Sequence, residues 1–360
     1  MPETLPVRTT GTDWLMARMV PFRFEILPSW LRYWIDGIAY RVLNGHPEIE
    51  TLRRPAPDEN GVERWRPLGI HDQFRFRVKP GVKEVRFGDP GWRLGYTKDA
   101  VNSYFVFRQL KKQGVLPAAL RFQVSLPLTY SAVTLFFADP EDHPRIVPGF
   151  TAALRAEVAK MIELIPPEDL AIQWDLAVEN RYIEGTLARE GAGAAGREAE
   201  RLTAPAREIS PYIPEQLALG DHSCFGTLDG WPSRQPPDLT GSVILLNAAV
   251  AASGRCVDFL HLPTLGSAED AFFAPLQDLR VDGARVYLGA IPTCTPPPTA
   301  YAANCEPHTN ICPVWDRCAL RVRAGAREAG PISDRAGLGG ANRLSGDHPE
   351  GPPERRRTAA

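Results

Sequence analysis

The sequence predicts an α/β fold, a (β/α)8 barrel of the TIM type that is incomplete at both ends and is followed by a disordered C-terminal tail. Three observations lead to this prediction. Five short apolar segments alternate with helical segments over residues 104–291, and parallel strands need such crossover connections. The 360 residues, 44% of them hydrophobic, suffice for one large barrel core. No glycine-rich phosphate loop follows any apolar segment, which favours a barrel over an open, doubly wound sheet.

The predicted strands are short and rich in aliphatic residues, which is typical of strands covered on both faces. They are Leu120–Leu126, Leu170–Asp175, Gln216–His222, Val257–Leu262 and Arg285–Ile291. The helix predicted at Phe150–Ile165 carries its apolar residues at helical spacing on one face. The other predicted helices are Tyr104–Gly114, a short stretch near Arg197–Leu202, Leu239–Ala252 and Ala268–Leu279. The Gly- and Ala-rich segment Gly191–Gly196 is expected to be a loop.

Two segments before the first predicted strand carry many charges. The proline-rich stretch Arg53–Arg66 is expected to be a solvated loop. Between Phe74 and Tyr96, aromatic residues alternate with arginines and lysines. Such alternation is compatible with nucleic-acid binding, but it is more typical of an amphipathic hairpin packed on a domain surface.

Composition argues against several classes of partner. The formal net charge of −2 leaves no broad basic field for nucleic acid or anionic lipid. The longest apolar stretch, Val243–Ala252, is too short to span a bilayer, and the N-terminus shows no signal-peptide pattern. We therefore expect a cytoplasmic protein with a small-molecule substrate, without nucleic-acid or membrane partners; the sequence leaves the oligomeric state open.

Polar residues stand at the carboxyl ends of three predicted strands: Asp175, His222 and His261. Barrel enzymes keep their active sites at this end, so we expect these side chains to converge. Successive side chains of a strand point to opposite faces, so His222 and Cys224 would aim the same way, as two ligands of one metal ion must. The alternative is that strand-end polar residues cap the next helix or satisfy loop backbone groups.

Two motifs resemble those of a known family. Ala171-Ile172-Gln173-Trp174-Asp175 is similar to the Ile-Gln-x-Asp strand of the cobalamin-independent methionine synthase catalytic domain and its uroporphyrinogen-decarboxylase-like relatives. His222-Ser223-Cys224 is similar to the metal-binding His-x-Cys of that superfamily. Further similarity, to its smaller single-domain branch, lies around Phe122–Pro127, Asp258–His261 and Val286–Gly289. The resemblance covers Leu27–Ile291.

The resemblance implies a zinc-dependent, methyltransferase-like enzyme. His222 and Cys224 would hold zinc, and coordination to zinc would convert a substrate thiol such as that of homocysteine into a thiolate nucleophile. Asp175 would bind the ammonium group of the amino acid, and Gln173 would orient Asp175. The thiolate would then attack a methyl group carried on a folate-type donor.

The chain departs from the family pattern at both ends. Nothing after Ile291 resembles the late strand that supplies a further cysteine ligand, so one zinc ligand is missing or displaced. His261 stands where the family has a glutamate near the metal; it is expected to act as a ligand, as a catalytic group or only as a hydrogen-bond donor. Arg32 and Asp36 are interpreted as substrate-binding remnants of the family's Asp-Gly-Glu-Thr-Gly loop.

The chain accordingly divides into an atypical N-terminal segment, residues 1–29, a TIM-barrel-like catalytic domain, residues 30–291, and a low-order tail, residues 292–360. The tail has no phenylalanine and no sustained helical or strand period. Reading the possible codons of Thr299–Pro313 one nucleotide earlier permits a strongly helix-forming sequence, so we hypothesise a frameshifted tail. Resequencing the codons for Ile291–Thr299 tests this, and an intact frame would end the idea.

Three functions remain open from the sequence. The first is metal-dependent transfer of a methyl group to a thiol. The second is a metal-free, decarboxylase-like barrel in which Asp175 and arginines such as Arg32 bind a carboxylated substrate and His222 acts as acid or base. The third is a non-catalytic, degenerate barrel, because a barrel that lacks strands exposes unpaired backbone.

Overall fold

The computed structural model describes residues 38–55, 74–88, 92–226, 234–265 and 269–289. All of them belong to one compact unit, Met1–Gly325. The predictions for residues 1–29, for Arg32 and Asp36, for most of the Arg53–Arg66 loop and for the tail lie outside the described residues.

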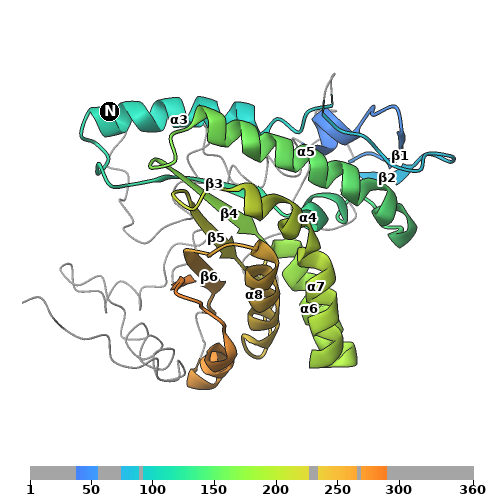
Figure 1. Cartoon of the computed structure of the whole chain (residues 1–360). Coiled ribbons are helices and arrows are strands. Elements are labelled where there is room, and N and C mark those ends of the chain that lie inside the picture. Colours follow the sequence, from blue (N-terminus) through green and yellow to red (C-terminus); the bar gives the residue numbers. More distant parts are fainter. Residues whose placement is uncertain (1–37, 56–73, 89–91, 227–233, 266–268, 290–360) are drawn as a thin grey trace, which may run out of the picture. The chain divides into compact units, whose positions relative to one another are not determined.

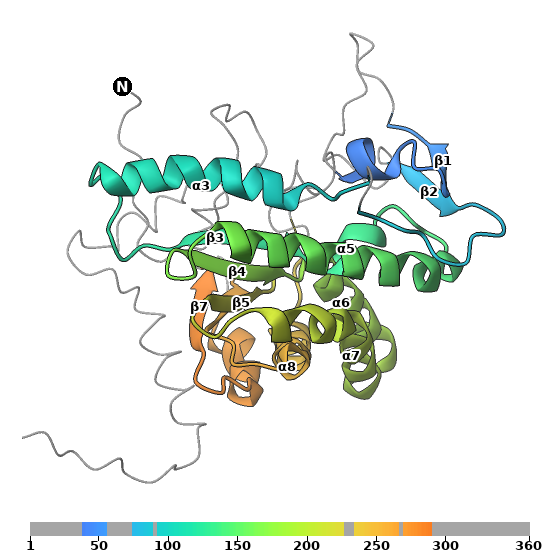
Figure 2. The same cartoon turned by 45° about the horizontal axis from the view of Figure 1, so that its top comes forward.

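Five parallel strands form the central sheet, which is labelled in Figures 1 and 2. They are β3 (Phe122–Pro127), β4 (Leu170–Asp175), β5 (Ala218–His222), β6 (Phe259–Pro263) and β7 (Arg285–Gly289). Each strand pairs with the next one in the sequence, so the strand order does not reverse within this sheet. The α/β class and the five predicted strands are confirmed, and each strand begins within two residues of its predicted start.

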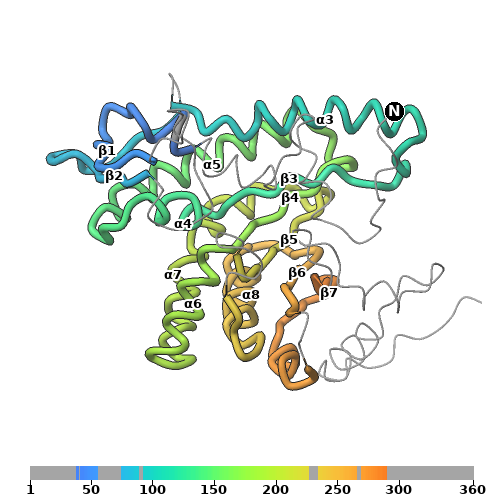
Figure 3. Tube along the Cα trace, turned by 180° about the vertical axis from the view of Figure 1, so that it is seen from behind, coloured from blue at the N-terminus to red at the C-terminus, as the bar shows by residue number. Residues whose placement is uncertain are grey.

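Helices connect the strands. They are α3 (Tyr96–Lys112), α4 (Thr129–Val133), α5 (His143–Leu164), α6 (Ala177–Glu190), α7 (Ala192–Ile209) and α8 (Thr240–Ser253). Short 3-10 segments are η4 (Pro140–Asp142), η5 (Ser210–Tyr212) and η6 (Asp270–Asp278), and η2 (Ala39–Leu43) is a π-helical turn. Helices α3 and α5 run side by side in Figure 2, and α6, α7 and α8 are neighbours in Figure 3.

One face of the sheet packs on these helices. The Phe122 ring of β3 lies 5.8 Å from the Tyr104 ring and 5.4 Å from the Phe107 ring of α3, measured between centroids. On β4, Trp174 Nε1 donates a hydrogen bond to Ser210 Oγ at 3.0 Å. Because side chains alternate along a strand, the residues between these point to the opposite face. That opposite face carries the polar side chains Gln123, Ser125, Gln173, Asp175, His222 and His261.

The structure departs from the predicted elements at three places. The predicted loop Gly191–Gly196 is a break of one residue: Gly191, at φ 82°, separates α6 from α7, and the glycines after it lie inside α7, where the surrounding alanines favour helix. Helix α6 was not predicted at all, because Val178 and Ile183 are its only buried aliphatic residues and its periodicity is weak. The predicted helix Ala268–Leu279 is the 3-10 segment η6, which contains Pro275 and so lacks one backbone donor.

A small antiparallel pair precedes the main sheet. Strand β1 (Ile49–Arg53) pairs with β2 (Arg75–Val78), and the Phe74 and Phe76 side chains are buried there. The sequence predicts an amphipathic hairpin within Phe74–Tyr96. Strand β2 lies in this segment, but it pairs with β1, which precedes the segment in the chain.

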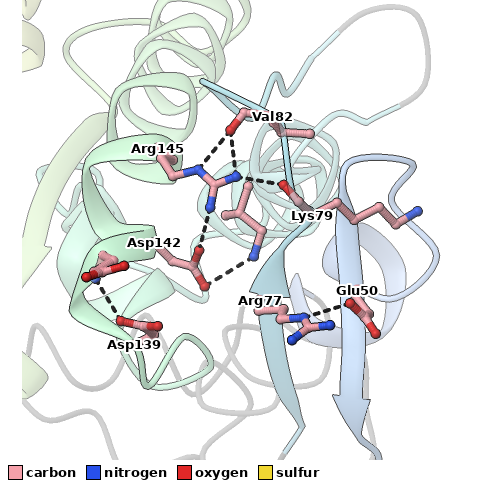
Figure 4. Close-up of polar contacts among 9 residues, drawn as sticks. Glu50, Arg77, Lys79, Val82, Asp139, Asp142 and Arg145 are labelled. Carbon is pink, nitrogen blue, oxygen red and sulfur yellow. Dashed lines mark hydrogen bonds and ion pairs between the residues drawn. The ribbon is translucent and has the colours of Figure 1, made fainter.

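Arg145 joins the segment after β2 to the start of α5, as Figure 4 shows. Its Nε and Nη2 donate to the Val82 carbonyl oxygen at 2.8 and 2.6 Å, and Nη2 also donates to the Lys79 carbonyl oxygen at 2.7 Å. Its Nη1 contacts Asp142 Oδ1 at 3.1 Å. Asp142 Oδ2 accepts a hydrogen bond from the Val78 amide at 3.1 Å. The guanidinium therefore bonds acceptors on two parts of the chain, and one of them, the Asp142 carboxylate, is buried.

Replacing Arg145 with methionine is expected to lower the free energy of unfolding by about 2–3 kcal/mol, because the Asp142 carboxylate and two carbonyl oxygens lose their donor. The matched control is Arg77→Met. It removes the exposed pair in Figure 4 that joins Arg77 Nε to Glu50 Oε2 at 2.7 Å, and it should cost at most about 1 kcal/mol. Urea unfolding followed by circular dichroism measures both; equal losses would contradict the role given to Arg145.

Candidate functional site

The strand-end polar residues lie in one row across the sheet. The register pairs Asp175 of β4 with His222 of β5, and His222 with His261 of β6. Pro127 and Tyr287 continue the row on the outer strands. Since paired residues of parallel strands point to the same face, the register brings together three residues that the sequence separates widely. All three lie at the carboxyl edge of the sheet.

The two histidines are in direct contact. His222 Nδ1 and His261 Nδ1 are 2.6 Å apart, and the rings stack with their centroids 4.6 Å apart at an interplanar angle of 25°. His261 is 6% exposed, and His222 is half-buried. At this separation one ring nitrogen donates a hydrogen bond to the other, because two lone pairs cannot point at one another.

A chain of hydrogen bonds leads along the same face to Asp175. Gln173 Nε2 donates to Asp175 Oδ1 at 2.6 Å and to Ser125 Oγ at 3.2 Å. Gln123 Nε2 donates to the same Ser125 Oγ at 3.1 Å. Gln173 and Asp175 are almost completely buried. The contact between them is the one expected if Gln173 orients the Asp175 carboxylate.

A second polar cluster lies on the helix side of the His222-Ser223-Cys224 segment. Asn180 Nδ2 of α6 donates to Ser223 Oγ and, at 2.9 Å, to Ser242 Oγ of α8. Ser223 Oγ also donates to Ser242 Oγ at 3.1 Å, and the Ser223 amide donates to the His261 carbonyl oxygen at 2.9 Å. The cluster is fully buried. It fixes the backbone between His222 and Cys224, and sequence reasoning missed it because its members lie on separate elements.

Cys224 lies beyond the end of β5, so strand alternation does not set the direction of its side chain. It is 6% exposed, and its carbonyl oxygen accepts a hydrogen bond from Arg234 Nη2 at 3.3 Å. Within the described part of the chain, no group of three or more His, Cys, Asp or Glu side chains is placed to hold one metal ion. The structure thus joins His222 to His261, and the pairing of His222 with Cys224 stays a prediction.

Two other buried acids, Glu179 and Asp221, do not belong to the row of strand-end residues. Glu179 Oε1 accepts a hydrogen bond from the Ser131 amide at 2.7 Å, and Oε2 accepts one from Ser131 Oγ. Burial raises the pKa of Glu179 to about 7, although these hydrogen bonds act in the opposite direction. Burial likewise raises the pKa of Asp221 to about 7. Asp221 is paired in register with Trp174, so it faces the helices rather than the row.

Comparisons of the chain with protein-family models, with curated proteins and with solved structures found no match. No helix among the described residues is long and apolar enough to cross a membrane. A proposal for the function therefore rests on the geometry of the site and on the sequence motifs.

Proposed function

We propose that the chain is a metal-dependent, methyltransferase-like barrel enzyme that activates a thiol, with His222 and His261 as metal ligands and Cys224 as a further ligand. The observation that carries this proposal is the 2.6 Å separation of the two Nδ1 atoms on neighbouring strands. Nitrogen ligands about 2.0–2.1 Å from a tetrahedral zinc ion lie about 3.3 Å apart. A small rotation of either ring gives that separation, and imidazole with thiolate is a donor set that suits zinc.

Three features support a closed barrel around this site. The strand order runs sequentially through β3 to β7, whereas a doubly wound sheet reverses its order at a switch point. The aromatic contacts of β3 and the Trp174–Ser210 hydrogen bond place helices on one face. The opposite face carries a group of polar side chains, most of them buried, which is typical of the inside of a barrel near its active site.

The roles of the other residues follow from their contacts. A bound zinc ion would convert the thiol of the substrate into a thiolate, because coordination to the metal removes the thiol proton. The Asp175 carboxylate, next to His222 in the row, is suited to bind the ammonium group of an amino-acid substrate. Gln173 holds that carboxylate through its 2.6 Å hydrogen bond. The proposed donor of the methyl group is a folate-type molecule.

The purified chain is expected to bind about one zinc ion. His222→Ala and His261→Ala should each weaken zinc binding by about 100-fold or more, since the loss of an outer partner alone costs about 10–100-fold. Cys224→Ser should also weaken it. Elemental analysis and titration against a chelator measure these effects.

His143→Ala is the matched control. His143 lies in α5 and contacts the Phe137 carbonyl oxygen through Nε2 at 3.0 Å, so its loss should leave zinc binding unchanged. A wild-type chain that binds no zinc would refute the metal-dependent function.

A metal-free acid–base function is the second candidate. The contact between His222 and His261 favours it, because two hydrogen-bonded imidazoles can hold and pass on one proton. Asp175 would then help to bind a carboxylated substrate, as in a decarboxylase-like barrel. Stabilisation of the protein by carboxylated ligands, but not by zinc, in a melting assay would favour this function over the first.

A further inference from the structure

Arg234 lies where the two strands that carry Asp175 and His222 end. Its Nη2 donates to the Ala177 carbonyl oxygen at 3.5 Å and to the Cys224 carbonyl oxygen at 3.3 Å. Ala177 follows Asp175 by two residues, and Cys224 follows His222 by two residues. The guanidinium therefore links the segments that follow the carboxyl ends of β4 and β5.

The hydrogen bonds of Nη2 do not account for the other terminal nitrogen of the guanidinium, Nη1. Arg234 Nη1 is buried and has no hydrogen-bond partner in the described structure. The Glu184 carboxylate of α6 is near enough to interact with the charge of the Arg234 guanidinium. Its Oε1 is also buried and has no hydrogen-bond partner, so Arg234 Nη1 and Glu184 Oε1 do not bond to each other. Burial lowers the pKa of the Arg234 guanidinium, and the charges of Cys224 and Glu184 counteract part of that effect.

A purely structural role accounts for Nη2, which links two loops, but not for Nη1. An arginine keeps its charge at neutral pH, and a buried donor without an acceptor costs free energy. A carboxylate is the acceptor whose two oxygens match the planar fork of a guanidinium. Both functions considered above use a substrate that carries a carboxylate.

We propose that Arg234 is a substrate-binding residue that receives the carboxylate group of the substrate through Nη1, at the edge of the sheet where Asp175 and His222 lie. This inference rests on the location of the proposed active site, but it does not depend on the metal. It names an anionic, carboxylate-bearing substrate for that site.

The test is calorimetric titration of the full chain, treated with a chelator, with succinate, with its neutral analogue succinamide and with inorganic phosphate. Succinate is expected to bind saturably and more tightly than phosphate, and succinamide is expected not to bind. Arg234→Gln should weaken succinate binding by about tenfold or more. Arg234→Lys keeps the positive charge but loses the planar guanidinium. The affinity of this variant for succinate should therefore lie between those of the wild type and Arg234→Gln.

Arg189→Gln is the matched control, because Arg189 is an exposed arginine near the end of α6 and its loss should leave succinate binding unchanged. Melting temperatures show whether each variant folds. If Arg234→Gln does not fold, the succinate affinity of Arg234→Lys is compared with that of the wild type instead. Absence of saturable succinate binding, equal or tighter binding of phosphate, or unchanged affinity in the folded Arg234 variants would overturn the inference. Zinc binding is measured separately, so a chain that binds zinc but not succinate contradicts this inference alone.

Discussion

Replacing Gly149 with alanine is expected to destabilise the protein by about 3 kcal/mol. A Cβ atom at Gly149 would lie 1.9 Å from the Val85 carbonyl oxygen and 3.1 Å from the Val85 carbonyl carbon. That backbone cannot easily move aside, because the Val85 amide donates to the Arg145 carbonyl oxygen of α5 at 2.8 Å. The gain of about 1 kcal/mol that alanine brings to a helix does not offset this overlap. Urea unfolding measures the difference.

Gly196→Ala is the matched control for Gly149→Ala. Gly196 also lies inside a helix, α7, but a Cβ atom there has no neighbour within 4 Å. The substitution should stabilise the protein by about 0.5–1 kcal/mol. If both variants were as stable as the wild type or more so, the close approach of the Val85 backbone to α5 would be wrong.

Replacing Glu179 with glutamine is expected to stabilise the protein at pH 8 by about 2–3 kcal/mol. Burial raises the pKa of Glu179 to about 7 from its ordinary value of 4.5. The folded state therefore favours the protonated acid. The contribution of Glu179 to stability is fully present below pH 4.5 and is lost as the pH rises through about 7. Glutamine keeps the shape and an acceptor for the Ser131 amide, but it carries no charge.

The measurement for Glu179→Gln is the free energy of unfolding between pH 5 and pH 8, at intervals of about half a unit. The wild type should lose stability over this range, and the variant should lose less. Glu163→Gln is the control, since the Glu163 side chain is exposed and should leave the pH dependence as it is. A variant with the same pH dependence as the wild type would contradict a buried, neutral Glu179.

The sheet was predictable because its strands are short apolar runs whose pattern requires no knowledge of the rest of the chain. Leu170–Asp175 was predicted with the bounds that the structure shows. Helix α6 was not, since few of its residues are apolar and packing against α7 and α8 contributes to it. The loop prediction failed at Gly191 because one glycine with positive φ suffices to separate two helices.

The site was predictable in part. Strand-end positions indicated Asp175, His222 and His261, and the register of neighbouring strands placed them in one row. The 2.6 Å contact between the histidines could not be predicted, because it depends on that register and on ring orientation. Arg234 was also missed, since only the folded chain brings it to the ends of β4 and β5.

The most direct measurement for the proposed function is anomalous X-ray diffraction at the zinc edge from crystals grown with zinc. The proposal predicts one peak within about 2.1 Å of a ring nitrogen of both His222 and His261, with Cys224 in reach. A peak elsewhere, or no peak while the two rings keep their hydrogen bond, would contradict a metal site at this edge of the sheet.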